Sequence, residues 1–168
     1  MGNIKNLNNE LAVEKIKELA KDQICLLCTV TDGGIISRPM GTQGIDDDGT
    51  IWFMSRKGSD KNEQIKADDT VYLQYLDTSK HHYLSITGSA GIITDRSKIE
   101  ELWNPMAKAW FEEGKDDPAI SLIRVTPTEG HYWDTKNGKL VTMLKIAAAA
   151  VTGSKDYGGV EGDINVSK

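Results

Sequence analysis

The chain has 168 residues, the usual length of one domain with a proper hydrophobic core, and its 39% hydrophobic and 27% charged residues argue against extended disorder. The net charge of −5 excludes an overall basic footprint for nucleic acid, and no apolar run approaches the ~20 residues that span a bilayer. The N-terminus, MGNIKNLNNE, lacks the apolar core of a signal peptide, so we expect a cytoplasmic protein with neither nucleic-acid nor membrane partners.

The first predicted elements are a helix and a strand. Apolar residues recur at helical spacing over residues 10–22, with charged residues between them, which predicts an amphipathic surface helix. Asn8 or Asn9 can cap its start. Residues 24–31 are apolar on both faces and predict a central strand, which residues 31–34, TDGG, end in a tight hairpin turn.

Two cysteines, Cys25 and Cys28, lie within this strand at C-x-x-C spacing, which redox and zinc sites also use. Residues three apart in a strand point to opposite faces of the sheet, and no second Cys or His pair completes a zinc site. The adjacent His81 and His82 cannot both face one metal from regular structure. We therefore predict two buried thiols, solvated loop histidines and no metal site.

The most informative stretch is residues 35–61, IISRPMGTQGIDDDGTIWFMSRKGSDK. Pro39 excludes a helix interior, and the Asp46–Gly49 turn separates this extended segment from the β-branched and aromatic run Thr50–Met54. The pattern predicts two strands joined as an antiparallel hairpin. Helical spacing resumes over residues 60–65.

The polar residues of this stretch predict an anion site. Lys61 falls in the first turn of the predicted helix, where free N–H groups attract anions. The hydroxyls of Ser55 and Ser59 supply further donors, and Arg38 can reach the same anion from the neighbouring strand. The intervening residues 56–57 are basic as well, but they fit a solvated loop.

The middle of the chain predicts two strands and a broken helix. The strands cover residues 71–77 and 83–94, and Gly88 and Gly91 within the second indicate a bulge, a strong bend or a close approach by ligand or backbone. Residues 96–114 have helical spacing that Asn104-Pro105 interrupts. Their large apolar side chains suit either a core face or a subunit interface.

The remaining pattern predicts a mainly β fold. Further strands are expected at residues 119–125, 129–134 and 140–145, with an irregularity at Pro127, a hairpin turn at 136–139 and an Ala-rich helical turn at 146–151. No βαβ alternation and no Gly-rich phosphate motif is present, so we expect about six strands in an antiparallel barrel with peripheral helices. Residues 1–152 then form one domain, and the glycine-containing residues 153–168 a mobile tail.

Three motifs in order resemble the general stress protein 26 family of pyridoxamine 5′-phosphate oxidase-like flavoproteins. They are Ser37-Arg-Pro-Met40, Trp52-Phe-Met-Ser55 and Ser59-Asp-Lys61, followed by Thr87–Ala90, Leu102-Trp103, His131–Asp134 and Lys145–Gly153. The resemblance covers nearly the whole chain. It implies a six-stranded antiparallel split β-barrel of the Greek-key type with helices at the start, middle and end, a homodimer, and FMN bound at the subunit interface.

The resemblance also implies roles for single residues. Arg38, Ser55 and Lys61, with Ser59 beside them, would hold the FMN phosphate. The ribityl chain and the ring would be flanked by Pro39, Met40, Phe53 and Met54. Trp133, together with Trp103, would come from the partner subunit or line the cavity.

The implied activity is that of a flavin-dependent oxidoreductase with a small substrate. Two alternatives stay open: a stress protein that holds flavin without turnover, and a dimer whose cavity takes another ligand such as haem. Authentic pyridoxamine phosphate oxidases close on their substrate with a basic C-terminal segment, whereas Arg124 is the last arginine here, which argues against that activity. No catalytic residue is assigned, since a flavin needs no general base for hydride chemistry.

Overall fold

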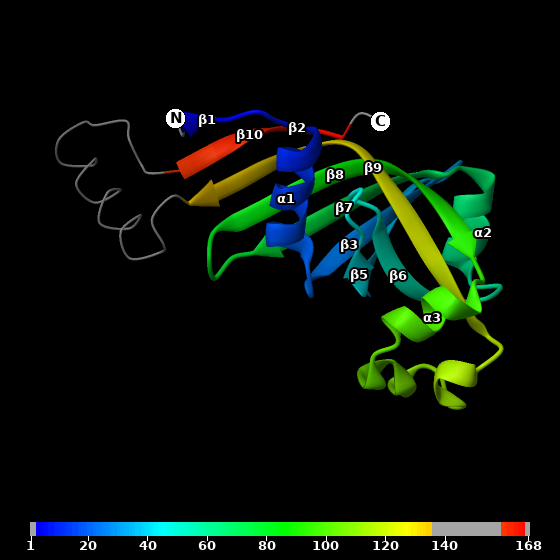
Figure 1. Ribbon diagram of the computed structural model, residues 1–168. Helices are drawn as coiled ribbons and strands as arrows, with labels where there is room; N and C mark the ends of the chain where they lie inside the picture. Colours follow the sequence, from blue (N-terminus) through cyan, green and yellow to red (C-terminus); the bar gives the residue numbers. More distant parts are fainter. Residues whose placement is uncertain (1–2, 136–158, 167–168) are drawn as a thin grey trace.

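The computed structural model describes residues 3–135 and 159–166, which form a strongly curved β-sheet with helices packed against it (Figure 1). The strands are β1 (Asn3–Ile4), β2 (Leu7–Asn8), β3 (Ile24–Thr31), β4 (Gly34–Gly41), β5 (Gly44–Ile45), β6 (Ile51–Arg56), β7 (Thr70–Asp77), β8 (His82–Ile93), β9 (Ile120–Thr135) and β10 (Gly159–Asn165). The helices are α1 (Asn9–Ala20), α2 (Asp60–Ala67) and α3 (Arg96–Leu102), with 3₁₀ turns η1 (Pro105–Ala109) and η2 (Gly114–Asp116). Among these described helices, none combines the length and apolar character needed to cross a membrane.

Six strands form the curved centre of the sheet, in the order β4-β3-β7-β8-β9-β6, and every neighbouring pair is antiparallel. Within the described residues no ladder joins β4 to β6, so the sheet curls without closing. The predicted mainly β fold is confirmed. The predicted total of six strands is wrong, because the described part holds ten, and the two-residue strands β1, β2 and β5 are too short to show an alternating pattern.

The hairpin predicted between the strands of the 35–61 stretch is only partly correct. β4 pairs with β3 along its whole length, as the TDGG turn indicates. Of the two strands β4 and β5 that precede β6, only β5 pairs with it, through Gly44–Trp52 and Ile45–Ile51. The chain between β4 and β6 therefore crosses from one free edge of the curved sheet to the other.

β9 is the longest of the described strands, and it pairs with three others. Its first part pairs with β6, its last part with β10, and β8 follows it throughout. The register shifts between Thr87 and Gly88, opposite Pro127, and a Cβ on Gly88 would lie 2.6 Å from the carbonyl oxygen of Thr126. The irregularities predicted at Gly88 and Pro127 are thus one β-bulge, within a continuous strand.

The residues assigned to a mobile tail include a strand. β10 pairs antiparallel with β9 and parallel with β1 and β2, so that segments from both ends of the chain lie side by side (Figure 1). For residues 159–165 the tail prediction is wrong, because β10 pairs with β1 and β2, which are more than a hundred residues away, and with β9, which lies before residues 136–158, so the pairing leaves no local signal. The turn, strand and helical turn predicted at 136–151, and the domain boundary at 152, lie outside the described residues.

Two apolar clusters hold the sheet. The inner face, which we define by Leu27, Leu73 and Ile86, packs against α1 and α2. The second cluster lies between α3, η1 and the opposite face of β6 and β9. β6 serves both, since Phe53 points into the inner cluster and Trp52 into the second, and the predicted buried strand at this place is confirmed. The predicted break in the middle helix is also confirmed, where the Asn104 side chain caps η1.

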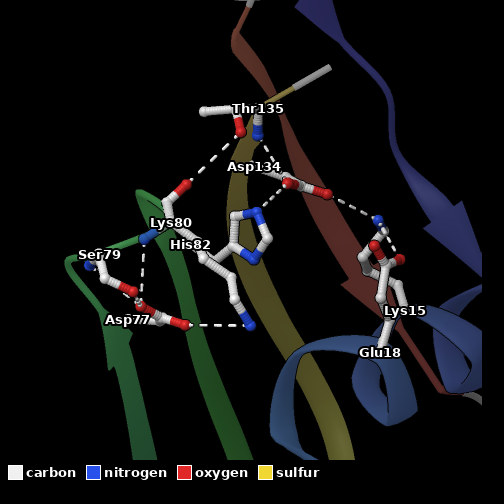
Figure 2. A network of polar contacts seen from close by, with 8 residues as sticks. All are labelled: Lys15, Glu18, Asp77, Ser79, Lys80, His82, Asp134 and Thr135. Atoms are coloured by element: carbon white, nitrogen blue, oxygen red, sulfur yellow. Dashed lines mark hydrogen bonds and ion pairs between the residues drawn. The ribbon is translucent and has the colours of Figure 1, made fainter. Parts of the chain in front are cut away.

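A polar network fastens α1 to the sheet (Figure 2). Asp134 on β9 accepts a hydrogen bond from Lys15 Nζ of α1 at 2.9 Å, and its other oxygen lies 3.0 Å from Nε2 of His82 at the start of β8. The Thr135 amide donates to the same carboxylate at 2.6 Å. His82 is therefore not a solvated loop histidine, because a carboxylate distant in the sequence lies beside it.

The cysteines are free, and both are buried. Cys25 packs in the inner cluster, where burial raises the pKa of its thiol to about 12. Cys28 points to the opposite face, and its Sγ lies 3.2 Å from Ser37 Oγ. The prediction of two buried thiols is confirmed.

Candidate anion-binding site

The site forms where β6 ends and α2 begins, beside β4. Ser59 is the N-cap residue of α2, and Lys61 lies in the first turn as predicted. Lys61 Nζ donates to Ser59 Oγ at 3.3 Å. The first N–H groups of a helix have no acceptor within it, so they and the lysine present donors to the same space.

Buried polar groups fix the hydroxyls of this site. Ser55 Oγ donates to Asn62 Oδ1 at 2.6 Å and lies 3.3 Å from Ser59 Oγ. The Asn62 Nδ2 donates in turn to Ser121 Oγ at 2.9 Å. Sequence reasoning missed Asn62 and Ser121, because Ser121 comes from β9. The one available signal was an amide side chain at the third position of a short helix.

Arg38 reaches the site from β4. Its Nη1 donates to Thr29 Oγ1 at 3.0 Å, and its Nη2 donates to Gln64 Oε1 at 2.8 Å. Its side chain lies on the inner face, since Arg38 stands opposite Leu27 in the β3–β4 ladder. The guanidinium is half-buried beside α2.

The two cations repel each other. Burial lowers the pKa of Lys61, the positive charge of Arg38 lowers it further, and Asp60 offsets part of this effect. Burial likewise lowers the pKa of Arg38. In the part of the chain that the structure describes, neither cation forms an ion pair with a carboxylate. A bound anion would relieve this repulsion.

The neighbouring basic residues point elsewhere. Arg56 Nη2 donates to the carbonyl of Trp110 at 3.2 Å, and Lys57 Nζ donates to that of Pro118 at 2.6 Å. Both side chains are exposed. The interpretation of residues 56–57 as a solvated basic loop is confirmed, and only Arg38 and Lys61 carry the charge of the site.

Comparison with known proteins decides the family. The sequence model described as Pyridoxamine 5'-phosphate oxidase like matches residues 11–157. The chain belongs to this family. Among curated proteins, bli-3 of Neurospora crassa is 27% identical over 130 residues, which are 72% of this chain and 62% of bli-3. The chain thus spans about three fifths of the length of this relative.

Solved structures of the family share the fold. A general stress protein 26 from Jannaschia sp. CCS1 is 29% identical with a TM-score of 0.75, covering 89% of this chain and 94% of that chain. A general stress FMN/FAD binding protein from Xanthomonas citri is 32% identical with a TM-score of 0.62, covering 74% of this chain and 89% of that chain. The resemblance that the motifs indicated is confirmed, and the similarity supports a split-barrel-like β fold.

The remaining residues expected from this oxidase-like family fall into three places. Pro39 and Met40 follow Arg38 on β4, where Pro39 is exposed and Met40 packs against the inner cluster. Phe53 is fully buried in that cluster, so only its backbone can face a ligand. Met54 and Trp103 each pack against the second cluster, and Met54 lies on the opposite face of β6 from Ser55.

The backbone of β6 remains partly open. β5 covers only Ile51 and Trp52, so among the described strands the rest of this edge has no partner toward β4. Arg38, Ser55, Ser59 and Lys61 therefore come together beside an open strand edge. The side chains of Phe53, Met54 and Trp103 do not join them.

Trp133 lies on the outer face, which is the face opposite the inner cluster on β3, β7, β8 and β9. It stands opposite Tyr83, which stands opposite Leu76, and these residues line an open groove of about 390 Å³. Four strand steps separate β9 from β4, about 19 Å along the sheet at the usual spacing. One subunit alone does not bring Trp133 to Arg38.

Proposed function

We propose that this chain is an FMN-binding protein of the general-stress type. Its phosphate site would consist of Arg38, Ser55, Ser59 and Lys61. The observation that carries this proposal is the pair of half-buried cations at the start of α2, which form no ion pair within the described residues. The flavin-binding relative from Xanthomonas citri supports the same assignment.

The donors of the site fit a phosphate. A guanidinium has five N–H donors, of which Arg38 uses two in the contacts with Thr29 and Gln64. An ammonium has three, and Lys61 uses one on Ser59. As far as the described residues show, the other donors are available for phosphate oxygens, to which charge-assisted hydrogen bonds are strong.

The proposed cofactor site requires a homodimer. Trp133 is 42% exposed, and it shares the outer face with Leu76 and Ile24, which are 59% and 69% exposed. An apolar row of this kind is typical of a subunit interface. A second copy packed on this face would bring its own Trp133 toward the open edge beside Arg38.

The proposed activity is that of an oxidoreductase with an unknown small substrate. Bound FMN supplies the hydride and electron chemistry, while the chain binds the phosphate through Arg38 and Lys61 and shields the site. Pyridoxamine phosphate oxidation is not part of this proposal. Action in the cytoplasm is part of the same proposal.

The test is a visible absorption spectrum of the purified protein, with the flavin released by heat and identified. Oxidised-flavin bands and about one FMN per subunit are expected, and a colourless protein that also fails to bind added FMN would overturn the proposal. Reduction of the bound flavin by NADH, NADPH or a substrate supports the oxidoreductase. A flavin that stays oxidised with all of them indicates a protein that holds flavin without turnover, and a Soret band on addition of haem indicates the haem alternative.

A further inference from the structure

Two uncharged side chains hold Arg38. Arg38 donates to Thr29 Oγ1 and to Gln64 Oε1. The hydroxyl of Thr29 donates to the same Gln64 oxygen at 2.7 Å. Arg38, Thr29 and Gln64 thus form a closed triangle of hydrogen bonds. Its corners come from β4, β3 and α2, the three elements that meet at the site.

The chemistry of the triangle fixes the orientation of the Gln64 amide. A guanidinium can only donate, so the atom of Gln64 that faces Arg38 has to be the oxygen. Thr29 is completely buried, and Gln64 is half-buried on α2. The side chains of Thr29 and Gln64 have little room to move, so their hydrogen bonds restrict the position of the Arg38 guanidinium.

An amide at position 64 has an electrostatic consequence. A carboxylate there would accept the same two hydrogen bonds, but it would also neutralise the charge of Arg38. With Gln64, the guanidinium forms no ion pair with a carboxylate among the described residues. The effect of Arg38 on the pKa of Lys61 agrees with this, since Asp60 offsets only part of the repulsion.

We propose that Gln64 is the positioning residue that gives this site its preference for a phosphate-bearing ligand over an uncharged one. It orients the guanidinium of Arg38 toward the anion without cancelling its charge. Thr29 supports Gln64 from β3. The inference rests on the proposed FMN site and assigns to it a residue that touches the cation rather than the ligand.

The decisive variant is Gln64→Glu, because it keeps the shape and both acceptor contacts. The dissociation constants of FMN and riboflavin are measured at low and at physiological ionic strength, together with the melting temperature. We expect FMN to weaken by about tenfold or more, with a smaller salt dependence, since one cation is neutralised. Riboflavin binding should change by less than about twofold, and the melting temperature should be kept.

Gln64→Leu complements this variant, because it removes the acceptor without adding a charge. We expect a smaller loss for FMN than with Gln64→Glu, and again no selective loss for riboflavin. Gln23→Glu is the matched control, since the exposed Gln23 lies six residues before Thr29, about 20 Å along β3 at the usual rise. It adds the same charge beyond the screening length at physiological ionic strength, where it should leave the affinity for both ligands unaffected.

The outcomes separate the two proposals. An unchanged ratio of FMN to riboflavin affinity in Gln64→Glu, or equal losses for both ligands, would overturn the role of Gln64 while the FMN site stands. A wild-type chain that binds neither FMN nor riboflavin would overturn the proposed function, and the role of Gln64 with it.

Discussion

Cations a few residues apart in the sequence have different surroundings in this fold. Lys61 is half-buried at the start of α2, whereas Lys57 is exposed and donates to the carbonyl of Pro118. We predict that Arg38→Ala and Lys61→Ala each weaken FMN binding roughly tenfold to a hundredfold, because a charge-assisted contact contributes about 1.5–3 kcal/mol. Titrations with FMN and riboflavin measure this effect, which riboflavin should not share.

Lys57→Ala is the control for these two variants. It removes a positive charge from the adjoining loop and should leave the FMN affinity within about twofold, since screened surface charges contribute little. Equal losses for FMN and riboflavin in the Arg38 or Lys61 variant would contradict a phosphate-binding role.

Cys25 allows a second prediction at this scale. Burial raises the pKa of its thiol to about 12, and the thiolate is the reactive form. In a Cys28→Ser variant, which leaves one thiol, we expect no reaction with a disulfide reagent at pH 8 in the native protein and one reacting thiol per chain in denaturant. Rapid reaction of the native variant would show that Cys25 is accessible and not held in the core.

The elements differ in how far the sequence predicts them. The strand at residues 24–31, the bulge at Gly88 and the helical break at Asn104-Pro105 follow from a continuous apolar run, from glycine and from proline, which act locally. β10 does not, because it pairs with β9, on the far side of residues 136–158, and with β1 and β2 near the other end of the chain. Local chemistry thus predicted the hairpin turn at residues 31–34 and α2, but not β10.

In the candidate site, too, some residues could be predicted from local sequence and others could not. Arg38, Ser55, Ser59 and Lys61 lie within one short stretch whose polar pattern is visible in the sequence. Their supports come from elsewhere: Ser121 lies on β9, and Thr29 lies on β3. Neither residue type is unusual for a strand, so only the pairing of strands reveals these contacts.

The network around Asp134 yields a prediction at the scale of elements (Figure 2). Its carboxylate, 12% exposed, binds both α1 and the start of β8. Asp134→Asn should lower the free energy of unfolding by about 1–3 kcal/mol, because Lys15 loses its partly buried partner. Urea denaturation at pH 7 measures this change.

Asp163→Asn is the matched control, since Asp163 also pairs with a histidine of β9, His131, at 2.8 Å. Its carboxylate is 71% exposed, so the loss should stay below about 1 kcal/mol. Similar losses in the two variants would contradict the idea that burial makes the Asp134 network important.

For the whole molecule, the arrangement of apolar residues favours one interface over another. The sequence left open whether the residues around Trp103 face the core or a second subunit. Ile99, Leu102 and Phe111 are buried in the second cluster, which leaves Met106 and Trp110 exposed on this side. The row of Ile24, Leu76 and Trp133 on the outer face extends over several strands, so it offers the broader surface for the proposed dimer.

Leu76→Glu tests whether the proposed dimer forms through the outer face. Leu76 stands beside Tyr83 in the middle of the row, and a buried unpaired carboxylate is costly, so the dimer should dissociate to monomers at micromolar concentration. FMN affinity should fall at least about tenfold, because the site would lose the aromatic groups of the second subunit. Light scattering during gel filtration measures the mass of the particle, and titration with FMN measures the affinity.

Met106→Glu is the control for Leu76→Glu. It introduces the same charge at a residue that is 75% exposed on η1, and it should leave the dimer intact. Dissociation by Met106→Glu but not by Leu76→Glu would place the interface at η1 instead, and would leave Trp133 without a role at the flavin.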